Sequence, residues 1–246
     1  MVEKKPIRRR ATIVSAAVIA VIALCALLPA TAAADTTSLT LVASPEVVAY
    51  NGSSILTGTL MDTTAMVAVG GQPIFVESAA GATGPWTTVV VITTPGSGDA
   101  YDTGTYTFVV GPRDKTFYRM RFLGTTGLDA ADSAPVSVTP RVYLSKPRVR
   151  ASIRHGQRFR ITSFIQPRHA AGLRTVVKFK FYRYTGGKWV FKKSLWATTS
   201  NYLDFTKLTL RTRLTRTGAW KFKAYAPADA LHAATTSPYS RVLINY

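Results

Sequence analysis

The chain has 246 residues, enough for one or two domains, and its net charge is +19. Hydrophobic residues make up 47% of it and charged residues 17%, a composition that argues against intrinsic disorder. Its single cysteine, Cys25, excludes a disulfide framework, a cysteine-ligated metal and a cysteine nucleophile. The three histidines, His155, His169 and His232, argue against a histidine-rich metal centre.

The N-terminal segment has the layout of a secretory signal peptide. Met1 to Arg10 contain five basic residues and one acid, the apolar run Ala16 to Leu28 follows, and small residues fill Ala30 to Ala34. This order predicts that residues 1–34 are removed on export. The alternative is an uncleaved membrane anchor, because residues 11–34 are uncharged and long enough to span a bilayer.

The remaining chain divides by charge. Residues 35–140 carry 4 basic and 9 acidic side chains, a net of −5, whereas residues 141–246 carry 22 basic and 2 acidic, a net of +20. Such an abrupt change indicates a module boundary. We therefore expect an acidic domain over residues 35–140 and a strongly basic domain over residues 141–246.

Apolar residues alternate with polar ones in both halves, the pattern of half-buried β-strands. The apolar positions are Tyr106, Phe108, Tyr118, Met120 and Phe122 in the first half and Val177, Phe179, Phe181, Trp220, Phe222 and Ala224 in the second. Turn signals such as Asn51-Gly52 and Gly186-Gly187 separate them. The predicted fold class is all-β.

The two halves also resemble one another. Pro45 and Pro147 lie 102 residues apart, and so do the strands Tyr118–Phe122 and Trp220–Ala224. A repeat of this length with about seven short strands is the size of an immunoglobulin-like sandwich. We predict two tandem antiparallel β-sandwich domains of this type.

The second half resembles an immunoglobulin-like repeat of secreted and cell-wall proteins of bacteria, of the actinobacterial type. The matching segments are Pro167–Gly172, Tyr182–Tyr184, Gly187–Trp189, Gly218–Trp220, Ala228–His232 and Thr235. The first half is similar to a more generic bacterial repeat, through Pro45, Tyr50–Gly52, Leu56–Leu60 and Tyr118–Phe122. The resemblance implies an extracellular accessory or adhesive module.

In such a sandwich, residues 177–184 and 219–225 are adjacent strands of one sheet. Their outward positions predict one face with Lys178, Lys180, Lys221 and Lys223, and with Tyr182, Tyr184 and Tyr225 at one end. Like charges opposite each other are destabilising, so an anionic partner or full solvation has to offset them. This is the expected ligand-binding face.

An alternative anion face lies on the other sheet, with Arg158 and Arg160 on one strand and Arg211 and Arg213 on its neighbour. Arginine grips phosphate or carboxylate with two parallel hydrogen bonds, whereas lysine acts as a point charge. Both sets equally fit a surface that only keeps exposed strands soluble.

Two loops are expected at one pole of the second sandwich, carrying Arg168 and His169 and carrying Asp229 and His232. Two histidines and a carboxylate could hold a metal. We interpret these residues instead as loop and turn residues and expect no metal.

Two other groups have a structural interpretation. The pairs Asp99 with Asp102 and Asp129 with Asp132 lack the run of oxygen ligands that calcium needs, so they are expected in turns. Trp86 and Trp189 are expected in the core, with stacking on sugars as the alternative.

Catalytic motifs are absent from the sequence: it has no Gly-x-Ser-x-Gly elbow, no His-Glu-x-x-His and no Gly-rich phosphate loop. We expect no enzyme activity and no cofactor. The predicted function is a secreted surface or cell-wall module that binds an anionic envelope polymer or acidic polysaccharide. The alternative is an adhesive protein with a protein partner; export disfavours nucleic acid.

N-terminal sequencing of the exported protein is expected to begin at Ala33 or Asp35. The reason is the order of basic, apolar and small residues, which directs cleavage after the small ones. A sequence that begins before Leu28 would favour the membrane anchor.

Overall fold

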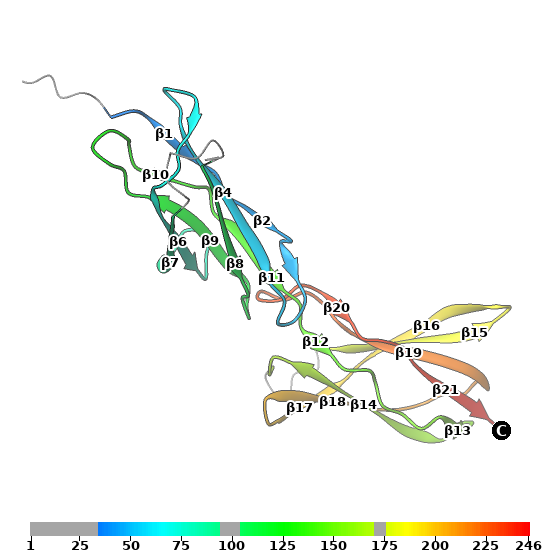
Figure 1. Cartoon of the computed structure of the whole chain (residues 1–246). Helices are drawn as coiled ribbons and strands as arrows, with labels where there is room; N and C mark the ends of the chain where they lie inside the picture. Colours follow the sequence, from blue (N-terminus) through cyan, green and yellow to red (C-terminus); the bar gives the residue numbers. More distant parts are fainter. Residues whose placement is uncertain (1–33, 94–103, 170–175) are drawn as a thin grey trace, which may run out of the picture. The chain divides into compact units, whose positions relative to one another are not determined.

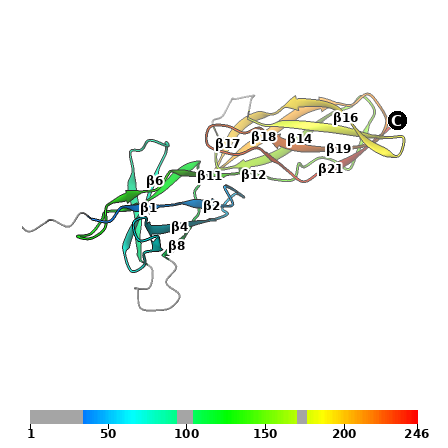
Figure 2. The ribbon, with the colours of Figure 1, turned by 90° about the horizontal axis from the view of Figure 1, so that it is seen from above.

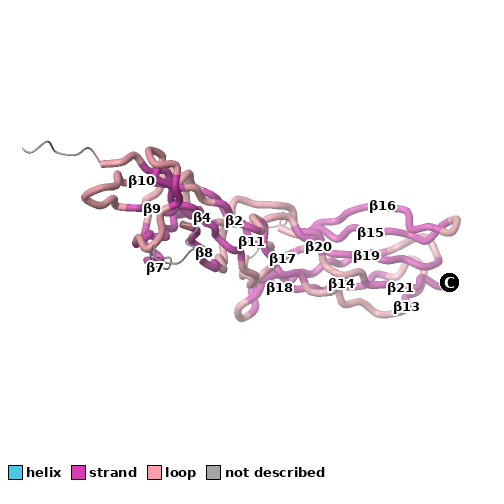
Figure 3. Tube along the Cα trace, turned by 45° about the horizontal axis from the view of Figure 1, so that its top comes forward, coloured by secondary structure: helices cyan, strands magenta, loops and turns pink. Residues whose placement is uncertain are grey.

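A computed structural model describes residues 34–93, 104–169 and 176–246 of the protein, and its regular structure consists of strands (Figure 3). Within these ranges no helix is long and apolar enough to cross a membrane. The predicted signal peptide lies outside the described residues, apart from Ala34, and stays a prediction.

The first half forms two sheets (Figure 1). In one, β4 (Ser54–Asp62) pairs with β2 (Val42–Ser44) and β8 (Thr105–Val110) on its two edges and, near its end, with β1 (Thr37–Leu39) and β5 (Val67–Ala68). The other has the order β3 (Val47–Val48), β11 (Val136–Pro140), β9 (Thr116–Phe122), β6 (Pro73–Ala79) and β7 (Thr87–Thr93), and β10 (Ala131–Asp132) also pairs with β9.

The second half repeats this plan (Figure 2). One sheet has the order β12 (Tyr143–Leu144), β14 (Arg158–Gln166), β18 (Phe205–Arg213) and β17 (Thr198–Tyr202). The other has the order β13 (Ser152–Arg154), β21 (Ser240–Asn245), β19 (Gly218–Ala226), β15 (Lys178–Thr185) and β16 (Lys188–Trp196), and β20 (Thr235–Thr236) pairs with β19.

This strand order is that of an immunoglobulin-like sandwich. In the second half, β12, β14, β18 and β17 take the places of strands A, B, E and D, and β15, β19 and β21 those of C, F and G. β16 adds a strand beside β15, as in variable-type domains. The predicted all-β class and tandem immunoglobulin-like sandwiches are confirmed.

The alternating strands bury their apolar members in two separate clusters. One cluster takes its buried residues from positions 39–138 and the other from positions 142–244. In the second cluster the Phe222 ring packs against Phe181 at 5.5 Å and Phe179 at 6.5 Å. All three phenylalanines have 0% exposure, as their alternation predicts.

The turn between β15 and β16 requires glycine. Thr185 pairs with Lys188, so Gly186 and Gly187 alone form the loop, with φ of +57° and +76°. Positive φ at both positions is the requirement of a type I′ turn, whose twist matches that of the two strands.

A serine interrupts the last strand of each sandwich in the same way. Ser133 accepts a hydrogen bond from the Met120 N–H at 2.9 Å, and Ser237 accepts one from the Ala224 N–H at 2.9 Å. The two serines are 104 residues apart in the sequence, and so are the donors Met120 and Ala224. The alignment of Tyr118 with Trp220 over 102 residues is therefore two residues out of register at this strand. A shift of two keeps every side chain on its own face, which is why alternation does not reveal it.

We predict that residues 35–140 and 141–246 fold independently, because each range has its own core. Each half expressed alone should unfold cooperatively. In the full chain, Phe222→Ala should lower the unfolding free energy of the second half by about 3–5 kcal/mol and leave the midpoint of the first half unchanged. Denaturant titration monitored by two-dimensional NMR resolves the two transitions.

The independent-domain prediction fails if either half is disordered alone, or if Phe222→Ala moves both midpoints together.

Candidate functional site

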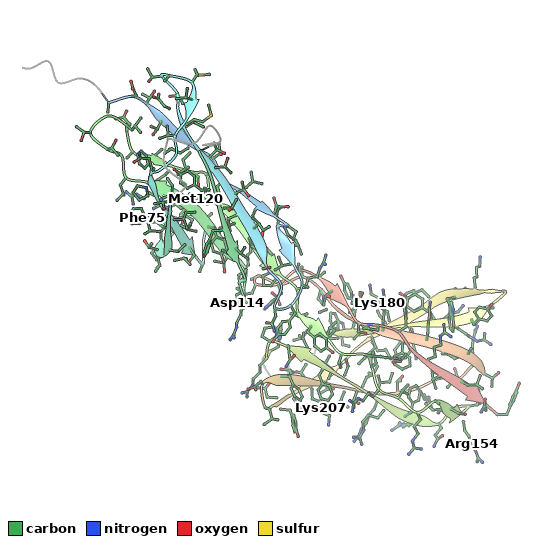
Figure 4. All side chains as sticks on the ribbon, viewed as in Figure 1. Phe75, Asp114, Met120, Arg154, Lys180 and Lys207 are labelled. Atoms are coloured by element: carbon green, nitrogen blue, oxygen red, sulfur yellow. The ribbon has the colours of Figure 1, made fainter. Side chains whose placement is uncertain are left out.

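The outer side of the β15–β19 pair carries lysines. The cross-strand pairs are Lys178 with Tyr225, Lys180 with Lys223 and Tyr182 with Lys221. Because Phe179, Phe181 and Phe222 point into the core, these neighbours point away from it. Figure 4 labels Lys180 on β15 and Lys207 on β18, strands of the two different sheets.

The neighbouring strands add aromatic rings to this side. On β16, Trp196 lies opposite Lys178, Phe191 opposite Tyr182 and Trp189 opposite Tyr184. Tyr239 and Arg241 come from the segment around the start of β21. We call this set the lysine–aromatic face: Lys178, Lys180, Tyr182, Tyr184, Trp189, Phe191, Trp196, Lys221, Lys223, Tyr225, Tyr239 and Arg241.

The cations of the lysine–aromatic face rest over its rings. Lys180 Nζ lies 3.7 Å from the centroid of Tyr225. Lys221 Nζ lies 4.2 Å from that of Tyr239 and 4.8 Å from that of Trp189. These are cation–π distances, each contributing about 0.5–1 kcal/mol at an exposed site. The contacts hold the ammonium groups in place without neutralising them.

No carboxylate lies among the strands of this sheet: β13, β15, β16, β19, β20 and β21 contain no Asp or Glu. The first sandwich differs at the corresponding position. There Glu77 on β6 lies opposite Arg119 on β9, and Arg119 Nε is 2.6 Å from Glu77 Oε2. The second sandwich has Lys180 opposite Lys223 at this position. The fold therefore accommodates an opposite-charge pair at the site where the second half places two lysines.

Burial lowers the pKa of Lys180 below its usual 10.5, and the charges of Lys178 and Lys223 lower it further, while Tyr239 acts in the opposite direction. Burial also raises the pKa of Tyr182, and the neighbouring Tyr239 adds to this rise. The positive charge of Lys180 is therefore held at a free-energy cost.

The tyrosines do not gather at one end of the face. Tyr182 and Tyr184 lie near the turn between β15 and β16, and the Tyr184 ring contacts Trp189 at 5.2 Å. Tyr225 lies at the other end, because it pairs with Lys178, the first residue of β15. Aromatic rings are therefore spread along the whole face.

The interpretation of Trp86 and Trp189 as core residues is wrong. Trp189 is half-buried on the lysine–aromatic face, and the half-buried Trp86 ring stacks on Arg119, with Cζ 4.7 Å from the centroid. Trp220 is the buried tryptophan, with 4% exposure. The prediction failed because β16, at the sheet edge, has its polar and apolar residues out of strict alternation, with a register shift beside Tyr182.

The four arginines of the other sheet pair across β14 and β18. Arg158 lies opposite Arg213 and Arg160 opposite Arg211, and all four are exposed. They line a groove of about 900 Å³ together with Lys193. Among the described residues that line the groove, Phe159 is the only aromatic one, so this surface offers charge with little ring surface.

The structure brings His169, Asp229 and His232 together. The two imidazole rings are 5.5 Å apart, and Asp229 lies within 3.6 Å of both. Arg168 binds Asn201 instead: its guanidinium donates to the Asn201 side-chain oxygen at 3.0 and 3.2 Å. In this orientation the Asn201 amide nitrogen donates to the His169 carbonyl and the Thr206 hydroxyl. The pole is therefore a histidine–carboxylate cluster.

Asp229 is held as an anion. Burial alone would raise its pKa, but the Leu231 and His232 backbone N–H groups donate to Oδ1 at 2.8 and 2.7 Å, and His232 adds a favourable charge. Together these lower the pKa of Asp229 below its usual 3.8.

The two aspartate pairs considered for calcium do not form a common site among the described residues. Asp132 lies in strand β10 and not in a turn as expected. It accepts from Arg119 at 3.1 Å and lies 3.5 Å from Arg121, so it belongs to an ion-pair network. Asp129 donates its backbone N–H to the Asp35 carbonyl at 2.9 Å. Asp99 and Asp102 lie outside the described residues.

We predict that Lys223→Glu raises the unfolding free energy of the second sandwich by about 0.2–1 kcal/mol at low salt, because it replaces the like-charge pair by an opposite-charge pair. The pKa of Lys180 should rise at the same time. Chemical denaturation measures the first and NMR titration of the lysine side chains the second.

Lys188→Glu is the matched control, since it makes the same charge change beside the exposed turn, where its partner is Thr185. An equal gain from Lys188→Glu, with the Lys180 pKa unchanged in Lys223→Glu, would show that only the net charge matters.

Comparisons with known proteins find similarity to solved structures alone. No protein-family model matches the sequence, and no curated protein matches it. Among solved structures, the ICAM-5 D1–D4 ectodomain fragment is 15% identical, with a TM-score of 0.43, over 84% of this chain and 53% of that one. The Yersinia pseudotuberculosis adhesin InvE is 17% identical, with a TM-score of 0.33, over 85% and 59%. This chain thus spans between half and three fifths of either structure, and we assign the immunoglobulin-like fold from its strand order.

Proposed function

We propose that this protein is an exported, non-catalytic cell-surface or cell-wall module whose lysine–aromatic face binds an acidic polysaccharide or anionic envelope polymer. The observation that carries the proposal is the like-charge pair Lys180–Lys223 on a sheet without a carboxylate, at the position where the first sandwich pairs Glu77 with Arg119. A ligand that brings anions relieves this repulsion on binding.

The aromatic rings favour a carbohydrate as the carrier of those anions. Trp189, Tyr184 and Tyr239 offer flat apolar surfaces between the cations, with Lys221 within 4.8 Å of two of their ring centroids. Rings of this kind provide a rigid apolar surface for a sugar, and lysine provides point charges for carboxylate or phosphate. The arginine groove lacks a comparable array of rings.

The charge of the whole second half supports the same ligand class. A net charge of +20 over residues 141–246 raises the local concentration of a polyanion and the rate of its encounter. Within this proposal the first sandwich is a spacer or docking module.

A protein partner is the second candidate function. Exposed apolar side chains gather on the β2–β4–β8 surface of the first sandwich, where Ile55 (50% exposed) lies directly opposite Val109 (58% exposed). Val42 on β2 is 61% exposed. Such a patch is typical of protein-binding surfaces.

We expect the full chain to bind polygalacturonate, with an affinity that falls steeply as salt rises, and not to bind neutral dextran. The quadruple variant Lys178→Gln, Lys180→Gln, Lys221→Gln and Lys223→Gln should lower the affinity about tenfold or more at low salt and flatten the salt dependence, because it removes the ion contacts. Calorimetric titration across a salt series measures both.

The matched control is the quadruple variant Arg158→Gln, Arg160→Gln, Arg211→Gln and Arg213→Gln, which removes the same charge from the other sheet. Poly(glycerol phosphate) tests the anionic envelope polymer, and duplex DNA is a polyanion outside the proposal. Binding to DNA as tight as to either of the other two polymers would contradict it. Equal losses from both variants would contradict a specific face, and an affinity insensitive to salt would contradict a polyanion. Attachment to cells without binding to any of these polymers would favour the protein partner.

A further inference from the structure

The histidine–carboxylate cluster has a geometry that the proposed function does not use. His169 follows the end of β14, and Asp229 and His232 lie between β19 and β20. One ligand atom from each residue lies within 4.8 Å of the other two. The cluster therefore joins two segments that are far apart in sequence.

The tautomer of His169 is determined by its backbone partner. Its Nδ1 lies 2.8 Å from the Pro167 carbonyl oxygen, which can only accept, so Nδ1 carries the hydrogen. In the neutral ring Nε2 then has a free lone pair. That lone pair faces Asp229 Oδ2 at 3.6 Å, a carboxylate oxygen that also only accepts.

His232 has the same excess of acceptors around it. Its Nδ1 lies 3.3 Å from Asp229 Oδ1, while the buried Nε2 has no hydrogen-bond partner among the described residues and lies 3.4 Å from Asp114 Oδ1. The residue is only 5% exposed. Acidic oxygens therefore face both ring nitrogens of His232, an arrangement that suits a bound cation.

The ligands are also held in place. Oδ1 of Asp229 accepts from two backbone N–H groups, while Oδ2 is the oxygen that lies 3.6 Å from His169 Nε2. The buried Thr206 hydroxyl accepts from the His169 N–H and donates to the His169 carbonyl, both at 2.8 Å. A carbonyl on the second ring nitrogen and a hydrogen-bonded carboxylate are the supports that metal ligands ordinarily have.

We propose that His169, Asp229 and His232 form a binding site for a divalent transition-metal ion of the zinc class. Two ligands about 2.1 Å from a tetrahedral ion lie about 3.4 Å apart, close to the 3.6 Å between His169 Nε2 and Asp229 Oδ2. The three ligand atoms lie within 4.8 Å of one another, so the side chains have to close around the ion when it binds. Imidazole nitrogens favour such ions over calcium and magnesium, which prefer oxygen. Three protein ligands leave a fourth position for water or an anionic group.

Binding of the ion links the segment after β14 to the loop between β19 and β20. Because the site exists in the folded protein alone, the metal stabilises the second sandwich by mass action. This inference is independent of the lysine–aromatic face, which lies on strands β15, β16, β19 and β21 and uses none of these side chains.

The test is calorimetric titration of the chelator-treated full chain with zinc chloride at pH 7.5. We expect one zinc ion per chain and a higher melting temperature in its presence. His169→Gln and Asp229→Asn should each weaken binding about tenfold or more, while circular dichroism shows the fold retained. Both side chains are partly exposed, and the amide oxygen introduced by Asp229→Asn can still accept the two backbone hydrogen bonds.

His155→Gln is the matched control, because His155 bonds to the Thr215 carbonyl, away from this cluster. NMR of the imidazole nitrogens should show a zinc-induced shift at His169 Nε2. The proposal is overturned if zinc does not bind at one per chain, if His169→Gln binds as tightly as the wild type, or if His155→Gln weakens binding equally. A parallel titration with calcium chloride adds a further check, since equal affinity for calcium would also contradict the proposal.

Discussion

The alternation of β15 and β19 is the constraint on which the second sandwich depends. Phe179, Phe181 and Phe222 have 0% exposure, and each can enter the core only if its strand neighbours point outward. A register shift of one residue would bring lysines into the core, so the packing of the rings fixes which side the ammonium groups occupy. The core and the lysine–aromatic face are thus two consequences of one pairing.

The outward side of the β15–β19 pair carries a like-charge repulsion that the packing of the core does not require. In the first sandwich the corresponding cross-strand position holds Glu77 and Arg119 in a short ion pair, whereas the second holds Lys180 and Lys223. Cation–π contacts such as Lys180 with Tyr225 keep the ammonium groups ordered and leave their charge available. Charge that is ordered and not neutralised within its own sheet is suited to an anionic ligand.

Sequence patterns predicted the central strands well because these strands alternate strictly and are buried on one side. The positions of Lys180 and Lys223 followed directly from Phe179 and Phe222. Trp189 was misplaced because β16 is an edge strand with a register shift, where alternation no longer reports the face. The histidine cluster depends on the approach of two loops, and the tautomer of His169 depends on the Pro167 carbonyl, which no side-chain pattern encodes.

The most direct measurement of the central claim is NMR mapping of a short oligogalacturonate on the full chain. We expect the largest shifts on the side chains of Lys180, Lys221 and Lys223 and on the rings of Trp189 and Tyr239. Shifts concentrated on Arg158, Arg160, Arg211 and Arg213, or spread evenly over the basic residues, would contradict it.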